Sequence, residues 1–130
     1  MPTPRYCIIA FLAKHPSTSL DDFRTYYETQ HIPLILRTVR ATGAPLPLVY
    51  TRRYLDAKNP VVTASGEVVG FDCMTELQFA SKADFEENWV KPLMVGEGRE
   101  AVEQDEAKFL NRGRTMAYQF EMMSTEGEGI

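Results

Sequence analysis

The sequence is poor in the residues on which covalent frameworks and metal sites depend. Only two of its 130 residues are cysteines, Cys7 and Cys73, and both lie in apolar segments typical of strands. Two cysteines make neither a disulfide framework nor a zinc site, so we expect buried free thiols. The two histidines, His15 and His31, exclude a multi-histidine metal site within one chain, whereas a carboxylate-rich site stays open.

Clusters of basic residues and long apolar runs are also missing. The net charge is −4, and no group of Lys and Arg interleaves with aromatic residues, which argues against nucleic acid as a partner. The apolar stretch over residues 6–13 is too short to span a membrane and has no cleavage-site context. We therefore expect a cytoplasmic protein without a membrane partner.

The length and composition are those of one globular domain. Hydrophobic residues make up 44% and charged residues 25% of the chain. We assign residues 1–123 to a single domain. Residues 124–130 are polar and glycine-rich, and they are predicted to form a disordered tail.

The hydrophobic pattern predicts the order strand, helix, strand, strand, helix, strand. Strands are expected over residues 5–14, 46–55, 70–79 and 115–123, with a long connection over residues 56–69. The first helix begins after Ser19 and ends near Gly43, and it should kink near His31 because Pro33 disfavours helical geometry before it. The second helix begins after Ser81, and Pro92 and the glycines that follow should break it before residues 99–110.

This order is that of an α+β, ferredoxin-like β-α-β-β-α-β fold with a four-stranded antiparallel sheet. Two helices cover only one face of such a sheet, yet both parities of the first strand are apolar. Met116, Tyr118, Phe120 and Met122 also share one face of the last strand. An apolar second face needs a partner, so we expect a homodimer whose two sheets enclose the ligand cavity, a dimeric α/β barrel.

His31 is the main candidate for chemistry, because it lies at the predicted helix discontinuity before Pro33. Backbone groups freed at such a point can orient the ring, and an imidazole that titrates near neutral pH suits general acid–base catalysis. A structural histidine, hydrogen-bonded at the kink, is the alternative interpretation.

Three segments carry a resemblance to a known family. FRTYYETQHIPL, residues 23–34, resembles the F-x-x-Y-Y-x-x-x-H-x-P-L signature of the EthD family, within the dimeric α/β-barrel superfamily. GFDCMTELQF, residues 70–79, resembles the third strand of that family. DEAKFLNRGRT, residues 105–115, resembles its D-E-x-x-F-x-D segment, although Asn111 stands where family members often have Asp.

The family includes proteins of aromatic polyketide pathways, some of which resemble decarboxylases of anthrone-type acids, and superfamily relatives act as polyketide cyclases. Other members accompany oxidative degradation systems and have no settled activity. The resemblance implies no metal or organic cofactor, and haem ligation by His31 stays an alternative because some barrels of the superfamily bind haem. It assigns His31 as the acid–base residue and Asp72 as its partner in the cavity. A carboxylate that satisfies a turn at the strand start is the other interpretation of Asp72.

Aromatic side chains near these positions suit a flat polycyclic ligand, although such stripes are also typical of a core. Arg52 can anchor a substrate carboxylate if it faces the cavity. The residues expected to bind the ligand are Phe11, Tyr27, Tyr50, Arg52, Met74, Phe85, Trp89 and Tyr118. The sequence thus favours a cofactor-independent lyase, a decarboxylase of an aromatic polyketide-type acid in secondary metabolism. A cyclase or dehydratase and a non-catalytic carrier of a hydrophobic small molecule are the alternatives.

Overall fold

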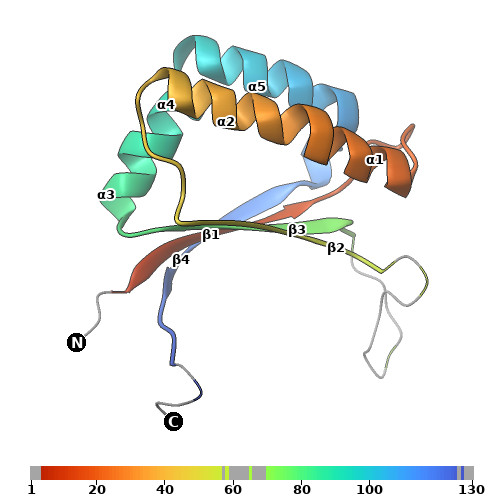
Figure 1. The fold of residues 1–130 in the computed structure, drawn as a ribbon. Coiled ribbons are helices and arrows are strands. Elements are labelled where there is room, and N and C mark those ends of the chain that lie inside the picture. Colours follow the sequence, from red (N-terminus) through yellow and green to blue (C-terminus); the bar gives the residue numbers. More distant parts are fainter. Residues whose placement is uncertain (1–3, 57, 59–64, 66–69, 126, 128–130) are drawn as a thin grey trace.

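The computed structural model describes residues 4–56, 58, 65, 70–125 and 127, in which one face of an antiparallel sheet is covered by helices (Figure 1). The strand order across the sheet is β2-β3-β1-β4. The strands are β1 (Arg5–Leu12), β2 (Val49–Tyr54), β3 (Cys73–Phe79) and β4 (Met116–Met122). The predicted ferredoxin-like fold is therefore confirmed. Most of the predicted connection over 56–69, and residues 126 and 128–130 of the predicted tail, lie outside the described residues.

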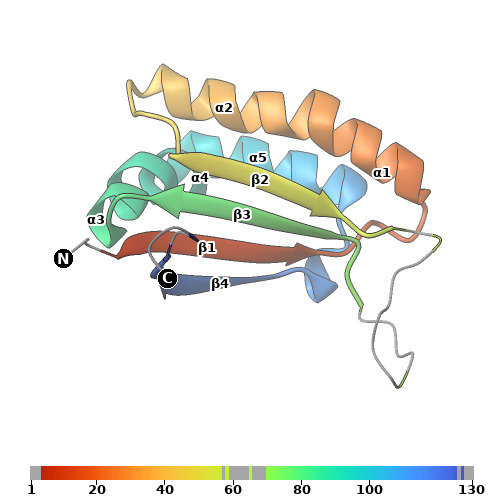
Figure 2. The ribbon, with the colours of Figure 1, turned by 60° about the horizontal axis from the view of Figure 1, so that its bottom comes forward.

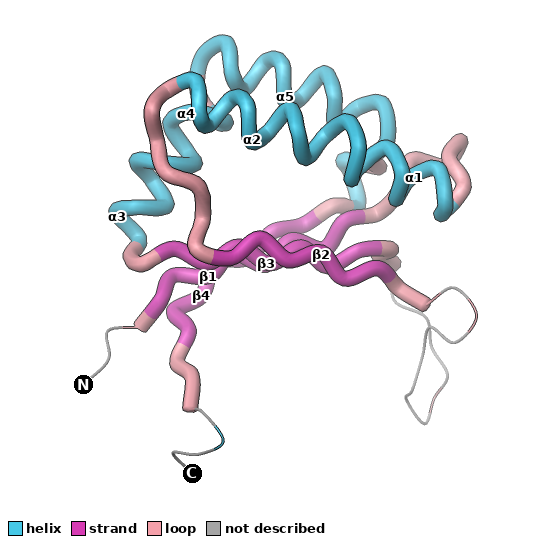
Figure 3. The backbone as a smooth tube through the Cα atoms, in the orientation of Figure 1, coloured by secondary structure: helices cyan, strands magenta, loops and turns pink. Residues whose placement is uncertain are grey.

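The helices form a single layer on one side of the sheet (Figure 3). The first helical segment consists of α1 (Leu20–Tyr26), the π-helical turn η1 (Tyr27–His31) and α2 (Ile32–Ala41). The second consists of α3 (Lys82–Phe85), the π-helical turn η2 (Glu86–Val90), α4 (Lys91–Met94) and α5 (Gly96–Phe109). A short 3-10 turn, η3 (Arg112–Arg114), leads into β4.

The predicted kink before Pro33 is a π-helical turn. Pro33 has no backbone N–H to donate, and the wider turn lets the N–H of Ile32 donate to the carbonyl of Tyr27. The helix therefore continues from α1 into α2 without a restart. His31 is the last residue of this turn, so the proline fixes where the imidazole projects.

The second helical segment resolves its proline in the same way. The turn η2 ends at Val90, two residues before Pro92, as η1 ends two residues before Pro33. The prediction that Pro92 breaks the helix is therefore wrong, because α4 continues through it to Met94. The break lies between α4 and α5, where Val95 is extended and Gly96 has a φ of +69°, in the left-handed region that favours glycine. The predicted break at Gly96 is thus confirmed.

Alternation along the strands separates the two faces of the sheet. The helix-facing side chains, such as Ile8 and Leu77, pack with Val39 and Trp89 in the main core cluster. Both cysteines are buried free thiols, as predicted, with exposed fractions of 2% for Cys7 and 0% for Cys73. No helix among the described residues is long and apolar enough to cross a membrane.

The opposite face of the sheet carries no helix (Figure 2). Three side chains of β4 stay exposed there: Met116 to 56%, Tyr118 to 49% and Phe120 to 43%. Across the β1–β4 pair, Phe11 lies opposite Met116, and the Phe11 ring contacts that of Tyr118 with centroids 6.1 Å apart. The predicted apolar second face is thus present.

The closest backbone approach in the helix layer lies at Gly98 of α5. A Cβ atom at this position would lie 2.0 Å from the carbonyl oxygen of Pro92. This oxygen belongs to the backbone, so it cannot move away as the end of a flexible side chain can. Gly98→Ala is therefore expected to lower the free energy of unfolding by about 2 kcal/mol, as overpacking does, in urea denaturation. Gly113→Ala is the matched control, since its Cβ would meet only a side-chain atom at 3.7 Å. Equal losses in the two variants would contradict this account.

Candidate active site

A cavity of about 420 Å³ lies between the helix layer and the covered face of the sheet. Its apolar wall includes Ile8 and Leu77 from the sheet and Ile35, Trp89 and Leu93 from the helices. All of its lining residues come from one chain. His31 and its cavity thus lie on the helix-covered side of the sheet, so the expectation that the uncovered faces of two copies enclose His31 is corrected.

His31 lines this cavity from the end of the turn η1. Its side chain is 8% exposed, and its Nδ1 atom lies 2.8 Å from Oδ2 of Asp105 on α5. The other carboxylate oxygen, Oδ1, accepts a hydrogen bond of 2.5 Å from the Tyr26 hydroxyl. No hydrogen-bond partner of Nε2 is found in the described part of the chain. The ring therefore donates from Nδ1 to Asp105 and presents the Nε2 lone pair to the cavity.

The surroundings keep this imidazole neutral. Burial lowers the pKa of His31 from its ordinary value of 6.5, while the hydrogen bond and negative charge of Asp105 oppose the shift without cancelling it. A neutral imidazole with a fixed tautomer accepts a proton at pH 7 without first losing one. The pair therefore has the protonation state that a general base requires.

Asp105, and not the predicted Asp72, is the carboxylate that pairs with His31. Oδ2 of Asp72 accepts the N–H of Lys14 at 2.8 Å, and the Asp72 N–H donates to the Leu12 carbonyl at 2.8 Å. Asp72 thus satisfies the backbone where β1 ends, as its alternative interpretation held, and it is not the partner of His31.

A signal for Asp105 was present in the sequence. Val102, Asp105 and Phe109 fall at positions i, i+3 and i+7 of a helix, and all three are buried. An acidic residue within a buried stripe requires a partner, because an unpaired carboxylate in the interior is costly.

Two tyrosine hydroxyls extend the polar part of the cavity. The hydroxyl of Tyr27 lies 2.7 Å from Oγ1 of Thr75, and Tyr50 lines the same cavity. Burial raises the pKa of Tyr50 to about 12 and that of Tyr27 well above 10. Both hydroxyls therefore keep their protons at neutral pH and serve as hydrogen-bond donors.

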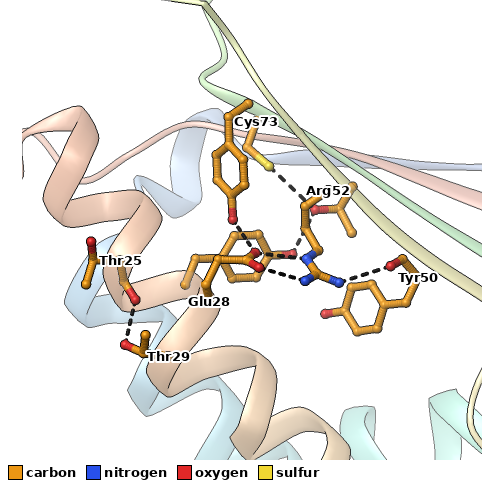
Figure 4. Close-up of polar contacts among 9 residues, drawn as sticks. Thr25, Glu28, Thr29, Tyr50, Arg52 and Cys73 are labelled. Carbon is orange, nitrogen blue, oxygen red and sulfur yellow. Dashed lines mark hydrogen bonds and ion pairs between the residues drawn. The ribbon is translucent and has the colours of Figure 1, made fainter.

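Arg52 faces the helices, but its guanidinium is already paired (Figure 4). Nε and Nη2 donate to the two oxygens of Glu28 at 2.9 and 2.7 Å, and the Tyr54 hydroxyl donates to the same carboxylate. A third donor, Nη1, binds the carbonyl of Tyr50 at 3.0 Å. Arg52 does not line the cavity, so the prediction that it anchors a substrate carboxylate is corrected. Its guanidinium instead binds Glu28 and the backbone carbonyl of Tyr50.

The other predicted ligand contacts divide between three regions. Tyr27, Tyr50 and Trp89 line the cavity, as predicted. Phe85 is core, with its ring 5.5 Å from that of Tyr6 and 5.4 Å from that of Phe79. The remaining three lie on the uncovered face of the sheet, away from His31: Phe11, Met74 and Tyr118.

The polar groups that line the cavity do not form a metal site. Within the described residues, no cluster of three or more His, Cys, Asp or Glu side chains is placed to hold a metal ion. The cavity volume of about 420 Å³ lies within the range of about 300–1,000 Å³ that pockets for drug-sized ligands occupy.

Comparison with known proteins supports both the fold and the family. The EthD domain model matches residues 15–113. No curated protein matches the chain at a significant level. Among solved structures, an EthD-like protein from Ralstonia eutropha JMP134 shares 14% identity with a TM-score of 0.65, over 97% of this chain and 98% of that one.

Two further structures are similar in fold. A hydroxynitrile lyase from Passiflora edulis shares 16% identity with a TM-score of 0.53, over 96% of this chain and 99% of that one. A dimeric ferredoxin-like protein of unknown function from Thermobifida fusca YX shares 14% identity with a TM-score of 0.53, over 92% of each chain. At these identities the likeness shows the fold alone.

The His31–Asp105 pair predicts a specific titration of the imidazole. In NMR spectra of the His15→Gln protein, the remaining histidine is expected to titrate below pH 6.5, because burial disfavours the cation. Asp105→Asn should lower this pKa further, because the carboxylate is the group that raises it. Asp72→Asn is the matched control and should leave the pKa in place. An imidazole that titrates above 6.5, or a larger shift in the Asp72 variant, would contradict the pairing.

Proposed function

Because the chain belongs to the EthD family, we propose that it is a cofactor-independent lyase that decarboxylates an aromatic polyketide-type acid by general acid–base catalysis. The observation that supports this most is the neutral His31 ring, oriented by Asp105 and open to an apolar cavity through Nε2. The family match covers residues 15–113 and includes both residues of this pair. The hydroxynitrile lyase among the fold neighbours supports the broader class, a lyase.

The chemistry requires one proton to move from oxygen to carbon. In an ortho-hydroxy aromatic acid, Nε2 of His31 takes the proton of the substrate hydroxyl and delivers it to the ring carbon that bears the carboxylate. The bond between that carbon and the carboxylate then breaks, carbon dioxide leaves, and the electron pair moves onto the substrate oxygen as a phenolate. A positioned proton-transfer group of this kind contributes about 10²–10⁴-fold in rate.

The tyrosine pair complements the charge that develops. The hydroxyls of Tyr27 and Tyr50 remain protonated, and both line the cavity that holds His31. Donors fixed before the reaction stabilise a developing phenolate more than the neutral ground state, since they need no reorganisation. The indole of Trp89 and the aliphatic wall provide the apolar surface on which a flat ring system packs.

Aldol-type cyclisation and dehydration use the same acid–base parts, and they are retained as the alternatives within this proposal. A non-catalytic carrier of a hydrophobic molecule would need no oriented imidazole. The buried His31–Asp105 pair therefore favours catalysis, because burying a carboxylate carries a cost that simple ligand storage does not require.

Replacing the imidazole tests the proposal. With a naphthoic acid that carries hydroxyls on both sides of its carboxylate, we expect the wild-type protein to release carbon dioxide and His31→Ala to lower kcat by at least about 10²-fold. Below pH 6.5 the wild-type rate should fall, because the protonated imidazole is no longer a base. Asp72→Asn serves as the control that keeps its activity.

Ligand affinity separates a catalyst from a carrier. The affinity for the product, dihydroxynaphthalene, measured by quenching of the single tryptophan, should change only a few-fold in His31→Ala. Binding without any release of carbon dioxide by the wild-type protein would support the carrier, and a Soret band in its visible spectrum would support haem.

We also propose that two copies pair through the uncovered face of the sheet. The exposed Met116, Tyr118 and Phe120 side chains form an apolar strip on β4, and a fold neighbour from Thermobifida fusca YX is a dimeric protein. Phe120→Glu should convert the dimer into a monomer in sedimentation velocity, whereas Leu48→Glu, at a residue exposed to 56% outside β4, should not. Since the cavity lies within one chain, the monomer should keep its affinity for dihydroxynaphthalene. A wild-type monomer at micromolar concentration would refute the pairing.

A further inference from the structure

Glu106, a titratable side chain of α5, lines the same cavity as His31. Glu106 follows Asp105 directly, so the two carboxylates point in different directions from the helix. Asp105 binds the rear of the imidazole at Nδ1, and Glu106 lines the cavity to which Nε2 opens. Glu106 therefore reaches the same ligand space as His31 from another wall.

The carboxyl group of Glu106 is available to a ligand. Its side chain is 26% exposed, and its nearest counter-charge is Nε of Arg112, 3.8 Å from Oε2 and beyond hydrogen-bond distance. Within the described part of the chain, no hydrogen bond reaches this carboxyl. By contrast, Glu103 one turn earlier, which also lines the cavity, is hydrogen-bonded by Nε of Arg99 at 2.9 Å. Glu106 is thus the cavity carboxyl without a hydrogen-bonding partner of its own.

The proposed reaction has a proton balance that His31 alone does not close. Decarboxylation of an aromatic carboxylate consumes one proton per turnover, while a neutral His31 only relays the proton of the substrate hydroxyl. The phenolate that remains must receive another proton. Tyr27 and Tyr50 do not supply it, because the pKa of Tyr50 is raised to about 12 and that of Tyr27 lies well above 10.

We propose that Glu106 is a second proton-transfer residue of the cavity, which donates its proton to the substrate oxygen as carbon dioxide leaves and regains one from water. This role rests on the proposed decarboxylation. The partly exposed rim formed by Glu103 and Arg112, with side chains exposed to 37% and 52%, gives water access to the carboxyl. The O–H bond of Glu106 breaks, the O–H bond of the product forms, and water restores the acid, so no further reactant is needed.

The charges around Glu106 are consistent with an acid. Burial raises the pKa of Glu106, and the negative charges of Glu103 and Asp105 raise it further, while Arg112 lowers it. Across the cavity, burial lowers the pKa of His31. The two pKa values thus move toward each other, which raises the fraction of molecules that hold a protonated Glu106 together with a neutral His31.

The test compares Glu106→Gln with Glu100→Gln, an exposed position on the same helix. With the dihydroxynaphthoic acid as substrate, the wild-type rate should rise with pH as His31 loses its proton and fall at higher pH as Glu106 loses its own. Glu106→Gln should lower kcat by about 10²-fold, change KM less than threefold and abolish the alkaline fall. Glu100→Gln should match the wild type. An unchanged kcat and alkaline limb in Glu106→Gln would overturn the proposal.

A binding experiment decides the same question without turnover. The affinity for dihydroxynaphthalene should change with pH in two steps in the wild-type protein. Glu106→Gln should lose one step and His31→Ala the other. If the wild type binds this ligand with both steps but releases no carbon dioxide from the acid, the decarboxylation fails and the Glu106 contact stands. A profile of Glu106→Gln identical to that of the wild type, or no binding at all, refutes the contact.

Discussion

The buried hydrogen bond between His31 and Asp105 is the interaction on which the site depends. It joins the end of η1 to the middle of α5, two elements that are 74 positions apart in sequence, and it lies under the rings of Tyr27 and Phe109. Nδ1 of His31 and the Tyr26 hydroxyl satisfy the two oxygens of this buried carboxylate, and Nζ of Lys108 lies 3.8 Å from Oδ1. The same hydrogen bond fixes the tautomer of the imidazole, with the proton on Nδ1. One contact thus joins two helices of the layer and determines which nitrogen of His31 carries the proton.

His31 and its cavity lie on the helix-covered side of the sheet, away from the exposed side chains of β4. The sheet has two apolar faces with separate uses: the helix-facing side bounds the cavity, and the exposed side chains of β4 form the surface available for pairing. A ligand in the cavity therefore contacts the helices and one sheet.

The fold was predictable because it follows from local patterns. Period-two alternation in Cys73–Phe79 and helical spacing after Ser19 and Ser81 locate strands and helices without reference to distant residues. The histidine was also predictable, from its place before Pro33. Its partner was not, because a residue near the strand start, Asp72, matched the expected chemistry while the topology brings the buried stripe of α5 to the ring instead. Arg52 was misassigned for a similar reason: sequence spacing gives the face of a strand, but it does not show that Glu28 already occupies the guanidinium.

The two π-helical turns make the subunit an imperfect internal duplicate. Each widened turn ends two residues before a proline, yet one ends in an imidazole, His31, and the other in an aliphatic side chain, Val90. In the second half, the π-helical turn η2 ends in an aliphatic side chain, and it lets the helix continue through Pro92, which has no backbone N–H. The two halves therefore differ in the side chain at the end of the turn, whereas the geometry of the turn is common to both.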